Sequence, residues 1–351
     1  MGNPKLIYLR SELNSNEYRC PIIPQDVNKL ITAGFTIYVE LSCNRIFDKI
    51  EYIKAGAIIT TEPWYAQKFQ SGLIIGLKDI PNLEKLSNHN HIYFSHTFKN
   101  QKNSELILKE FKLSNSILYD LEYLLDDNNK RLIAFGYYAG FVGCCLGLMQ
   151  YYTKRKTNTN IQDLKPFVSK TELINQVTRC RNLAPLTNIK IAVIGYNGRC
   201  GKGVIDVLDS LNIKYITLNK EEEKSKLEDF DIIYNCIVLN KSLNEVWLDK
   251  NTNFNKQITI VDISCDYNSA NNPIKLYNEA TTWKEPVFSH NKYVDIIGIN
   301  NLPSLLPKDS SEEFSEILVK LLLNFNDKTW NKCKSIYEEI ITPFSLKNGT
   351  L

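Results

Sequence analysis

The sequence has no excess of charge of either sign. Its 42 Lys and Arg residues exceed its 39 Asp and Glu residues by only three, and the basic residues are scattered along the chain. A nucleic-acid-binding surface would need them gathered into a patch or stripe. Apolar residues make up 43% and charged residues 23%, as in an ordinary folded chain. We therefore expect a globular protein that does not bind nucleic acid.

The sequence also lacks the cysteine patterns of metal knuckles and secreted scaffolds. None of its nine cysteines forms a CxxC pair. The first residues, MGNPKLIYLR, contain no charged leader followed by a long apolar stretch and a cleavage site, so we do not expect secretion. A reducing cytoplasm fits these features best.

Long apolar runs are missing as well, with one exception at residues 132–153. This segment carries no charge, and its four glycines include two pairs at GxxxG spacing, which is typical of membrane helices. However, the glycines and four tyrosines dilute its hydrophobicity, and no second such segment exists. We therefore interpret it as a buried helix that packs closely against a neighbour, and expect no membrane association.

Short apolar runs alternate with helical patterns along most of the chain. Such alternation predicts parallel sheets covered on both faces, and 351 residues are enough for two domains. Helices are expected at 24–33 and 104–112, with two more in the tail at 310–341. Strands are expected at 6–9, 36–41, 57–60, 73–77, 92–95 and 117–121, and then at 189–194, 214–218, 231–237, 258–263 and 295–299.

A glycine loop follows the strand expected at 189–194. Gly195, Gly198 and Gly201 stand between that strand and a helix that continues through 204–211. Glycines here allow a tight turn, close approach to a pyrophosphate and close packing of helix on strand. The GxxGxxG spacing is weak by itself, but its place between strand and helix favours dinucleotide binding over a plain turn.

The next expected strand ends at Asn219, where the usual fingerprint has an acidic residue for the adenosine ribose. An amide can still bind a hydroxyl, but it does not repel a 2′-phosphate, and Lys220 could attract one. The choice between NAD and NADP therefore stays open at this point.

Two cysteines are expected near the same loop. Cys200 would lie at the start of the loop helix and Cys236 near the end of the neighbouring strand. A helix N-terminus lowers the pKa of a thiol, so oxidation could join the two, although two buried free cysteines are the commoner arrangement.

The fold prediction is an α/β chain with two doubly wound, Rossmann-like parallel-sheet domains flanking an active-site cleft. Residues 1–133 would form a substrate-binding domain, onto which the C-terminal helices of 308–351 fold back. Residues 134–307 would form the dinucleotide-binding Rossmann domain. The stretch 154–188 is polar, so the glycine-rich helix is expected to open this second domain.

Polar residues terminate several of the expected strands in the first domain, where open parallel sheets bind ligands. Lys78 and His96 could converge there as proton acceptor and donor, or be a solvated strand end and an ordinary loop histidine. His89, His91 and His96 are poorly spaced for a metal site, and the sequence contains no GxSxG hydrolase motif. The other strand-end residues are Arg10, Glu12, Tyr119, Asp120 and Glu122.

Several longer motifs resemble the NAD-dependent, L-lysine-forming saccharopine dehydrogenases, within the alanine dehydrogenase and transhydrogenase group. The resemblance runs from residue 9 to about residue 307. It is carried, in chain order, by IIGLKDIP around Lys78, HIYFSHTFKNQ around His96, LYDLEYL, AFGYYAGFVG, GYNGRCGKGVIDVL, YNCIVL, VDISCDYNSANNPI and INNLPSLLP. Several long motifs in the same order are far more specific than the glycine loop alone.

The resemblance implies NAD-dependent oxidative deamination of saccharopine to L-lysine and 2-oxoglutarate through an imine. It implies Lys78 as the base for the substrate amine and His96 as the acid-base group for imine hydrolysis. The implied substrate-binding residues are Arg19, Gln101, Glu122, Arg131, Phe135, Ser264, Cys265 and Asp266. The implied cofactor-binding residues, beyond the glycines of the loop, are Lys130, Arg199, Asn219, Ile263, Ile299, Asn300, Asn301 and Leu302.

Three positions depart from the family pattern, all on the cofactor side: Lys130 replaces an arginine, Asn219 an aspartate, and Asn300-Asn301 a familiar Asp-His pair. Cofactor affinity and selectivity are affected more than the reaction. Two other functions stay open: a related opine or imine reductase that uses another amine, and a non-catalytic dinucleotide-binding homologue. The retained Lys78, His96, Glu122 and Arg131 favour an enzyme. We expect a monomer without a metal ion.

Overall fold

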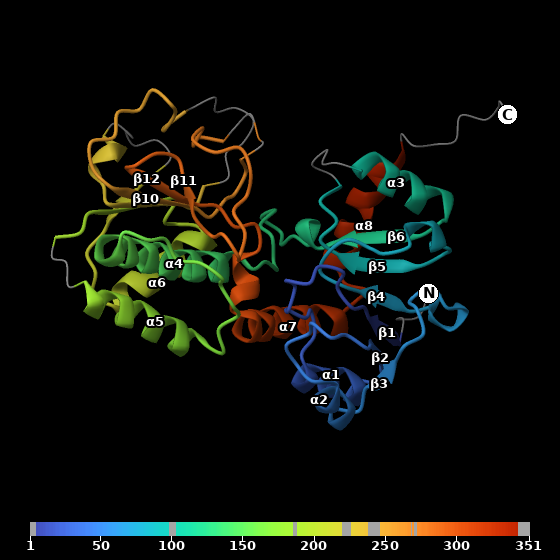
Figure 1. The fold of residues 1–351 in the computed structure, drawn as a ribbon. Helices are drawn as coiled ribbons and strands as arrows, with labels where there is room; N and C mark the ends of the chain where they lie inside the picture. Colours follow the sequence, from blue (N-terminus) through green and yellow to red (C-terminus); the bar gives the residue numbers. More distant parts are fainter. Residues whose placement is uncertain are drawn as a thin grey trace. The chain divides into compact units, whose positions relative to one another are not determined.

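The computed structural model describes residues 5–97, 103–184, 188–219, 226–237, 246–267, 269 and 272–342. The chain forms two compact units, shown in Figure 1. Unit 1 comprises Met1–Ala134 and Lys308–Leu351, and unit 2 comprises Phe135–Pro307. Each unit contains one six-stranded sheet, so the prediction of two parallel-sheet α/β domains is confirmed.

The sheet of unit 1 is parallel throughout. Its strands follow the order β3-β2-β1-β4-β5-β6, so the chain reverses its direction of growth between β1 and β4. In such sheets ligands bind at the carboxyl ends of the strands beside this reversal. The strands are β1 (Leu6–Leu9), β2 (Thr36–Glu40), β3 (Ile58–Thr60), β4 (Leu73–Ile75), β5 (Asn90–Tyr93) and β6 (Ile117–Asp120).

Both faces of this sheet are covered, partly by helices from the end of the chain. Tyr8, Ile74 and Phe111 pack with Tyr337 in a core on one face. The C-terminal helix α8 packs against β6 and α3, and hydroxyls of α7 accept hydrogen bonds from the segment that precedes α1. The helices of unit 1 are α1 (Pro24–Thr32), α2 (Lys49–Lys54), α3 (Ser104–Leu113), α7 (Pro307–Leu323) and α8 (Lys328–Ile341).

The sheet of unit 2 has the order β11-β12-β10-β9-β7-β8, with a reversal between β7 and β9. Every pairing is parallel except that of the two-residue strand β11 with β12, which the sequence analysis did not predict. The strands are β7 (Ile191–Ile194), β8 (Ile216–Leu218), β9 (Ile232–Asn235), β10 (Ile258–Asp262), β11 (Phe288–Ser289) and β12 (Val294–Ile297).

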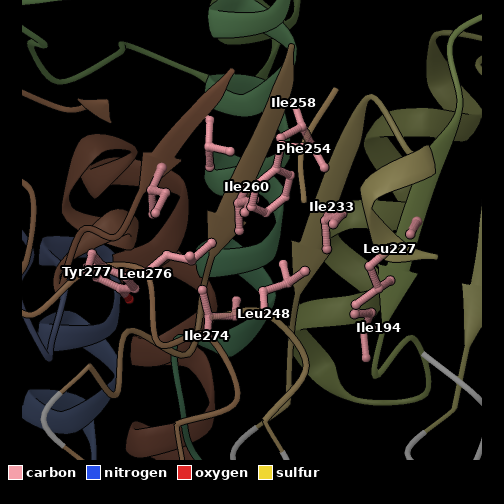
Figure 2. Close-up of a cluster of buried hydrophobic side chains, with 13 residues drawn as sticks. Ile194, Leu227, Ile233, Leu248, Phe254, Ile258, Ile260, Ile274, Leu276 and Tyr277 are labelled. Carbon is pink, nitrogen blue, oxygen red and sulfur yellow. The ribbon is translucent and has the colours of Figure 1, made fainter. Parts of the chain in front are cut away.

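The two faces of this sheet are covered differently. Helix α4 (Gly136–Thr157) packs on one face, where Tyr234 and Val261 meet Gly147. On the other face, the strand residues drawn in Figure 2 pack against Leu248, Phe254 and neighbours from a segment in which the described residues form no helix. The alternation of strands and helices predicted helices on both faces of this sheet. On this face, apolar side chains from irregular segments take the place of a helix.

The glycine-rich segment is a buried helix, as predicted. Helix α4 lies against α6 (Arg199–Ser210), and the main chains of the two helices touch: a Cβ on Gly140 would overlap the carbonyl of Cys200, and one on Gly203 that of Tyr137. None of the helices in the described ranges has the length and apolar composition of a membrane span.

The polar stretch 154–188 is more ordered than its composition suggested. Helix α4 continues into it, and α5 (Lys170–Leu183) follows, with the Ser169 hydroxyl accepting a hydrogen bond from the Glu172 N–H at its start. Only Leu173 and Val177 are buried on α5, and such a narrow apolar stripe is hard to detect in a sequence.

Candidate functional site

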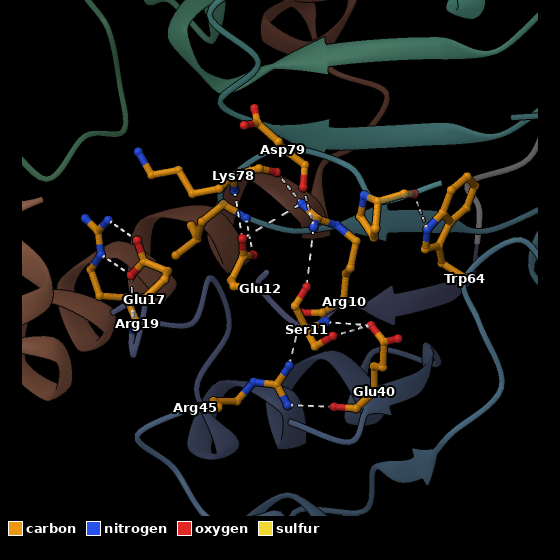
Figure 3. Close-up of polar contacts among 12 residues, drawn as sticks. Arg10, Ser11, Glu12, Glu17, Arg19, Glu40, Arg45, Trp64, Lys78 and Asp79 are labelled. Atoms are coloured by element: carbon orange, nitrogen blue, oxygen red, sulfur yellow. Dashed lines mark hydrogen bonds and ion pairs between the residues drawn. The ribbon is translucent and has the colours of Figure 1, made fainter. Parts of the chain in front are cut away.

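The predicted site residues are divided between the two units. Lys78 lies in unit 1, three residues after β4 and therefore beside the reversal point of the sheet (Figure 3). Burial lowers the pKa of Lys78, and the nearby positive charge of Arg19 lowers it further, while Glu17, Glu12 and Asp79 act in the opposite direction. A lysine with a lowered pKa carries more of the neutral amine that can accept a proton.

Arg19 is buried in a two-pronged ion pair with Glu17. Its Nε donates to Oε1 of Glu17 at 2.7 Å and its Nη2 to Oε2 at 2.5 Å. Burial acts to raise the pKa of Glu17, but the ion pair and hydrogen bonds with Arg19, together with Lys78, outweigh it, and the net pKa is lowered. The pair therefore brings a fixed positive charge and a fixed negative charge to Lys78. The sequence analysis missed Glu17, because its pairing with Arg19 is not visible in the sequence.

His96 lies in the loop after β5, which is the neighbour of β4 in the sheet. The backbone φ angle of His96 is +55°, which is rare for a residue with a side chain. Such backbone strain is often found at functional sites. The Ser95 hydroxyl beside it donates to the buried carboxylate of Asp120 at 2.7 Å. The loops that carry Lys78 and His96 are joined by a hydrogen bond from the Phe94 N–H to the Leu77 carbonyl, at 3.3 Å.

Glu122 connects His96 with Arg131. Its Oε1 lies 3.6 Å from Nδ1 of His96 and 3.0 Å from Nη1 of Arg131. Burial, together with the charge of Glu122, raises the pKa of Asp120 to about 6 in spite of its hydrogen bonds. The carboxyl ends of β5 and β6 thus hold a histidine, two carboxyl groups and an arginine in one cluster.

Two other predicted residues of unit 1 are less informative. Lys130 is exposed, and its backbone N–H donates to the carboxylate of Asp126 at 2.8 Å. Gln101 lies outside the described residues.

Among the residues that the structure describes, no group of three or more metal-ligating side chains is found. His89 and His91 instead pack edge-on against Trp64, and burial lowers the pKa of both imidazoles.

The glycine loop lies at the reversal point of unit 2. Gly195 has a φ of +80°, and Gly198 is the N-cap residue of α6, where no side chain among the described residues caps the helix. A Cβ on Gly198 would meet only the Gly195 carbonyl, at 3.5 Å, whereas one on Gly201 would overlap Tyr196. There is thus room for a ligand at Gly198, and the dipole of a helix N-terminus suits the pyrophosphate of a dinucleotide.

Apart from Arg199, the other predicted cofactor residues of unit 2 lie in segments that are distant from the loop in the sequence. Arg199 is the first residue of α6 and Asn219 directly follows β8. The side chains of Ile263 and Leu302 pack against Gly143 of α4. Further along, Ile299 is buried, Asn300 is exposed, and Asn301 accepts a hydrogen bond from the indole of Trp283 at 3.1 Å.

A buried carboxylate organises the loop after β10. The carboxylate of Asp262 accepts hydrogen bonds from Ser264 Oγ at 2.6 Å, the Cys265 N–H at 3.3 Å and the Tyr277 hydroxyl at 2.6 Å. Cys265 has a φ of +50°, and burial, with the charge of Asp262, raises the pKa of its thiol to about 12. The sequence analysis predicted Ser264, Cys265 and the exposed Asp266, but not the aspartate that holds their loop.

Cys200 is the second residue of α6 and Cys236 directly follows β9, which pairs with β7, the strand before α6. The structure records both as thiols rather than as a disulfide. Burial, reinforced by the nearby Cys200, raises the pKa of Cys236 well above its ordinary value. A disulfide between them stays a prediction. Phe135 precedes α4 as its N-cap residue and is half-buried in unit 2.

Comparison with known protein families identifies two matching models. Residues 8–142 match the N-terminal domain of alanine dehydrogenase/PNT, and residues 186–351 match the C-terminal domain of the same group. Among curated proteins, a Yarrowia lipolytica saccharopine dehydrogenase [NAD(+), L-lysine-forming] is 33% identical over 97% of this chain and 98% of its own length. The Candida glabrata protein of the same name is 36% identical over 90% of both chains.

Solved structures agree on the fold. An L-alanine dehydrogenase superposes with a TM-score of 0.71 and covers 97% of this chain and 100% of its own, at 11% sequence identity. A transhydrogenase from Sinorhizobium meliloti gives a TM-score of 0.59 at 16% identity, over 91% of this chain and 94% of its own. At such identities the likeness concerns the fold alone.

Proposed function

The chain belongs to the family of NAD(+)-dependent, L-lysine-forming saccharopine dehydrogenases, and we propose that it oxidises saccharopine with NAD to L-lysine and 2-oxoglutarate, and catalyses the reverse. The observation that carries the proposal is the match, over nearly the whole chain, to relatives of that name. The cluster of Lys78, His96, Glu122 and Arg131 at one edge of the unit 1 sheet supports it independently.

Lys78 is the base in this proposal. The nicotinamide supplies the hydride acceptor when the cofactor is bound. As the C–H bond of the substrate gives up its hydride, the secondary amine loses its proton to the neutral amine of Lys78, and a carbon–nitrogen double bond forms. The lowered pKa of Lys78 supports this role, because the base must be unprotonated before the step.

His96 handles the protons of imine hydrolysis. The imine nitrogen takes back the proton held by Lys78 as a water molecule adds to the imine carbon and gives a proton to the imidazole. As the carbon–nitrogen bond breaks, the imidazolium returns that proton to the departing lysine nitrogen, and the hydroxyl of the adduct loses its own proton to solvent as the carbonyl forms. Glu122, whose Oε1 is 3.6 Å from Nδ1, orients the ring and stabilises its protonated form. His96 therefore acts as a base in its neutral form and as an acid in its protonated form, so one side chain serves both steps of the hydrolysis.

Two arginines are proposed to bind substrate carboxylates, of which saccharopine has three. A guanidinium has five N–H donors in a planar fork, so Arg19 and Arg131 can each bind a second carboxylate beside Glu17 and Glu122. Gln101, Glu122, Phe135, Ser264, Cys265 and Asp266 are proposed to complete the substrate site.

NAD is proposed to bind unit 2 through the glycine loop and the N-terminus of α6, which makes this unit the dinucleotide-binding domain and unit 1 the substrate-binding domain. The uncapped helix N-terminus at Gly198 supports the pyrophosphate position. Asn219 is proposed to bind the adenosine ribose with a modest preference for NADH over NADPH. Arg199, Ile263, Ile299, Asn300, Asn301, Leu302 and Lys130 are proposed as the remaining contacts.

We further propose that the protein acts as a monomer in the cytoplasm. All nine cysteines are free thiols, which fits a reducing compartment. Light scattering on the purified protein and fluorescence microscopy of a tagged chain test the two parts of this proposal.

The experiment that tests the function follows NADH absorbance with purified protein. Oxidation is expected when L-lysine and 2-oxoglutarate are present together, and not with either alone, because the imine exists only after condensation. If a different amine or 2-oxo acid is required, the chain is a related opine or imine reductase. If NADH binds and no pair supports its oxidation, the chain is a non-catalytic homologue.

A further inference from the structure

Lys78 is held through its main chain by a buried arginine. Arg10 directly follows β1, the strand beside β4, and its side chain is 1% exposed. Its Nη2 donates to the Lys78 carbonyl and its Nη1 to the Asp79 carbonyl at 2.8 Å (Figure 3). One guanidinium therefore binds two successive carbonyls on the C-terminal side of Lys78.

A buried carboxylate holds the other side of the same residue. Glu12 accepts a hydrogen bond from the Leu77 N–H on Oε1 at 2.7 Å and from the Lys78 N–H on Oε2 at 3.0 Å. Its side chain is 5% exposed, and its Oε2 lies 4.0 Å from Nη2 of Arg10. Both peptide groups of Lys78 are thus bound by the two members of one buried ion pair.

The surroundings of Arg10 are shaped to keep this arrangement. A Cβ on Gly76 would overlap the Arg10 guanidinium, so glycine at this position leaves room for the guanidinium where it stands. Nη2 of Arg45 donates to the Arg10 carbonyl at 3.0 Å. Since a buried ion pair is often no more stabilising than apolar residues of the same volume, its placement on a single reactive residue points to function rather than to stability.

We propose that Glu12 and Arg10 are positioning residues for Lys78, which fix its main chain so that the amine is aimed at the substrate nitrogen. The role of Lys78 as base rests on the proposed function; the attachment of its main chain does not. A base must be held within hydrogen-bonding distance of its proton, so freedom of this short segment would slow the chemical step.

Glu12 also acts on Lys78 electrostatically. Burial and Arg19 lower the pKa of Lys78, and Glu17, Glu12 and Asp79 raise it, so removal of the Glu12 charge lowers it further. The amine then loses its proton at a lower pH. The acid limb of the kcat/KM profile, which falls as the base becomes protonated, should move in the same direction.

The test compares Glu12→Gln and Glu12→Asp with the control Glu40→Gln. Glu40 accepts hydrogen bonds from the N–H and hydroxyl of Ser11 at the same sheet edge, but contacts neither peptide of Lys78 in the described residues. Glu12→Gln should lower plateau kcat/KM by roughly tenfold and move the acid limb down by about one pH unit. Glu12→Asp keeps the charge, but its side chain is one methylene shorter and cannot reach the Leu77 and Lys78 N–H groups at the same hydrogen-bond distances. It should lower kcat/KM without moving the acid limb of the pH profile. Glu40→Gln should change neither.

A second readout needs no turnover: the pH dependence of Lys78 acetylation by acetic anhydride, followed by peptide mass spectrometry. Its midpoint should fall in Glu12→Gln and stay in place in Glu40→Gln. An unchanged midpoint, or a wild-type rate in Glu12→Asp, overturns the proposal. If Glu12→Gln does not fold, Glu12→Asp alone decides. If the unmodified protein has no activity and the acetylation midpoint still falls, the proposed function fails while the electrostatic action of Glu12 on Lys78 stands.

Discussion

The two sheets place their candidate sites at the same topological point but hold them by different forces. In unit 1, four buried charged side chains (Arg10, Glu12, Glu17 and Arg19) surround the main chain and the amine of Lys78. In unit 2, the loop after β7 contains Gly195 and Gly198, and the helix that follows it touches α4 main chain to main chain at Gly140 and Gly203. Proton transfer requires charges that adjust the pKa of the base, and this matches the role proposed for unit 1. Binding of a polyanion requires backbone N–H donors and close approach of the main chain, and this matches the role proposed for unit 2.

The largest effect is expected from breaking the glycine contact in unit 2. Gly140→Ala should lower the free energy of unfolding by about 3 kcal/mol and weaken NADH binding. The added methyl group would overlap the Cys200 carbonyl at the start of α6, the helix proposed to bind the pyrophosphate. Urea unfolding and calorimetry measure the two quantities.

Gly136→Ala is the matched control on the same helix. Its added methyl would meet the Arg199 Cβ at 3.2 Å and the Cys200 Sγ at 3.4 Å, which are side-chain atoms that can move by a few tenths of an ångström. An equal loss in both variants would show that main-chain contact is not what shapes the loop.

The next effect should appear in unit 1 alone. Lys78→Met and His96→Gln should each slow turnover by roughly a hundredfold, the usual contribution of a positioned acid or base, with NADH affinity nearly unchanged. Steady-state kinetics and calorimetry check this separation. A parallel loss of NADH binding would contradict the division of roles between the units.

Arg131→Ala should raise the substrate concentration needed for half-maximal rate more than it lowers the turnover rate. Loss of a carboxylate-binding group should raise KM by about tenfold with a smaller change in kcat, a modest value because the Arg131 side chain is 37% exposed and screened by solvent. Initial rates over a range of 2-oxoglutarate concentrations test it, and a pure kcat effect would assign Arg131 to the chemical step instead.

Acid should weaken unit 1 before unit 2. Burial lowers the pKa of His89 and His91 in the folded state, so the unfolded chain takes up protons first as the pH falls below about 6.5. Stability is therefore complete above that pH and is lost below it, by about 1 kcal/mol for the fully buried His91 between pH 6.5 and 5.5 and by less for His89. His91→Phe should remove part of this dependence in pH-dependent urea unfolding. An unchanged slope would mean that His91 does not contribute.

The smallest effect is expected at the ribose. Asn219→Asp should raise the preference for NADH over NADPH by about threefold, since a carboxylate repels a 2′-phosphate that an amide tolerates. Calorimetry with both cofactors gives the ratio, and His290→Gln, in the same unit, is a control that should leave it unchanged.

The sequence was most informative where one periodic signal decided the outcome. The apolar runs at 6–9 and 189–194 correctly marked β1 and β7, because buried parallel strands are almost purely apolar. Helix α5 was missed because it buries little apolar surface, and β11 because two residues show no period. Tertiary contacts, rather than a pattern in their own residues, determine elements such as α5 and β11.

The same limit applies to the site. Lys78 and His96 could be selected because they end apolar runs, a property visible along the chain. Glu17 and Asp262 could not, because their importance lies in pairing with Arg19 and in holding the Ser264 loop. Such partners are defined by the fold, and only the structure shows them.

The most direct test of the proposed reaction is to follow the hydride itself. NADH deuterated at both C4 positions is incubated with the protein, L-lysine and 2-oxoglutarate, and the product is analysed by mass spectrometry. The account predicts saccharopine that carries the deuterium on the carbon that was the keto carbon of 2-oxoglutarate, and a Lys78→Met sample with almost none. NADH oxidised without deuterium in any amine product, or no product at all from lysine, would contradict it.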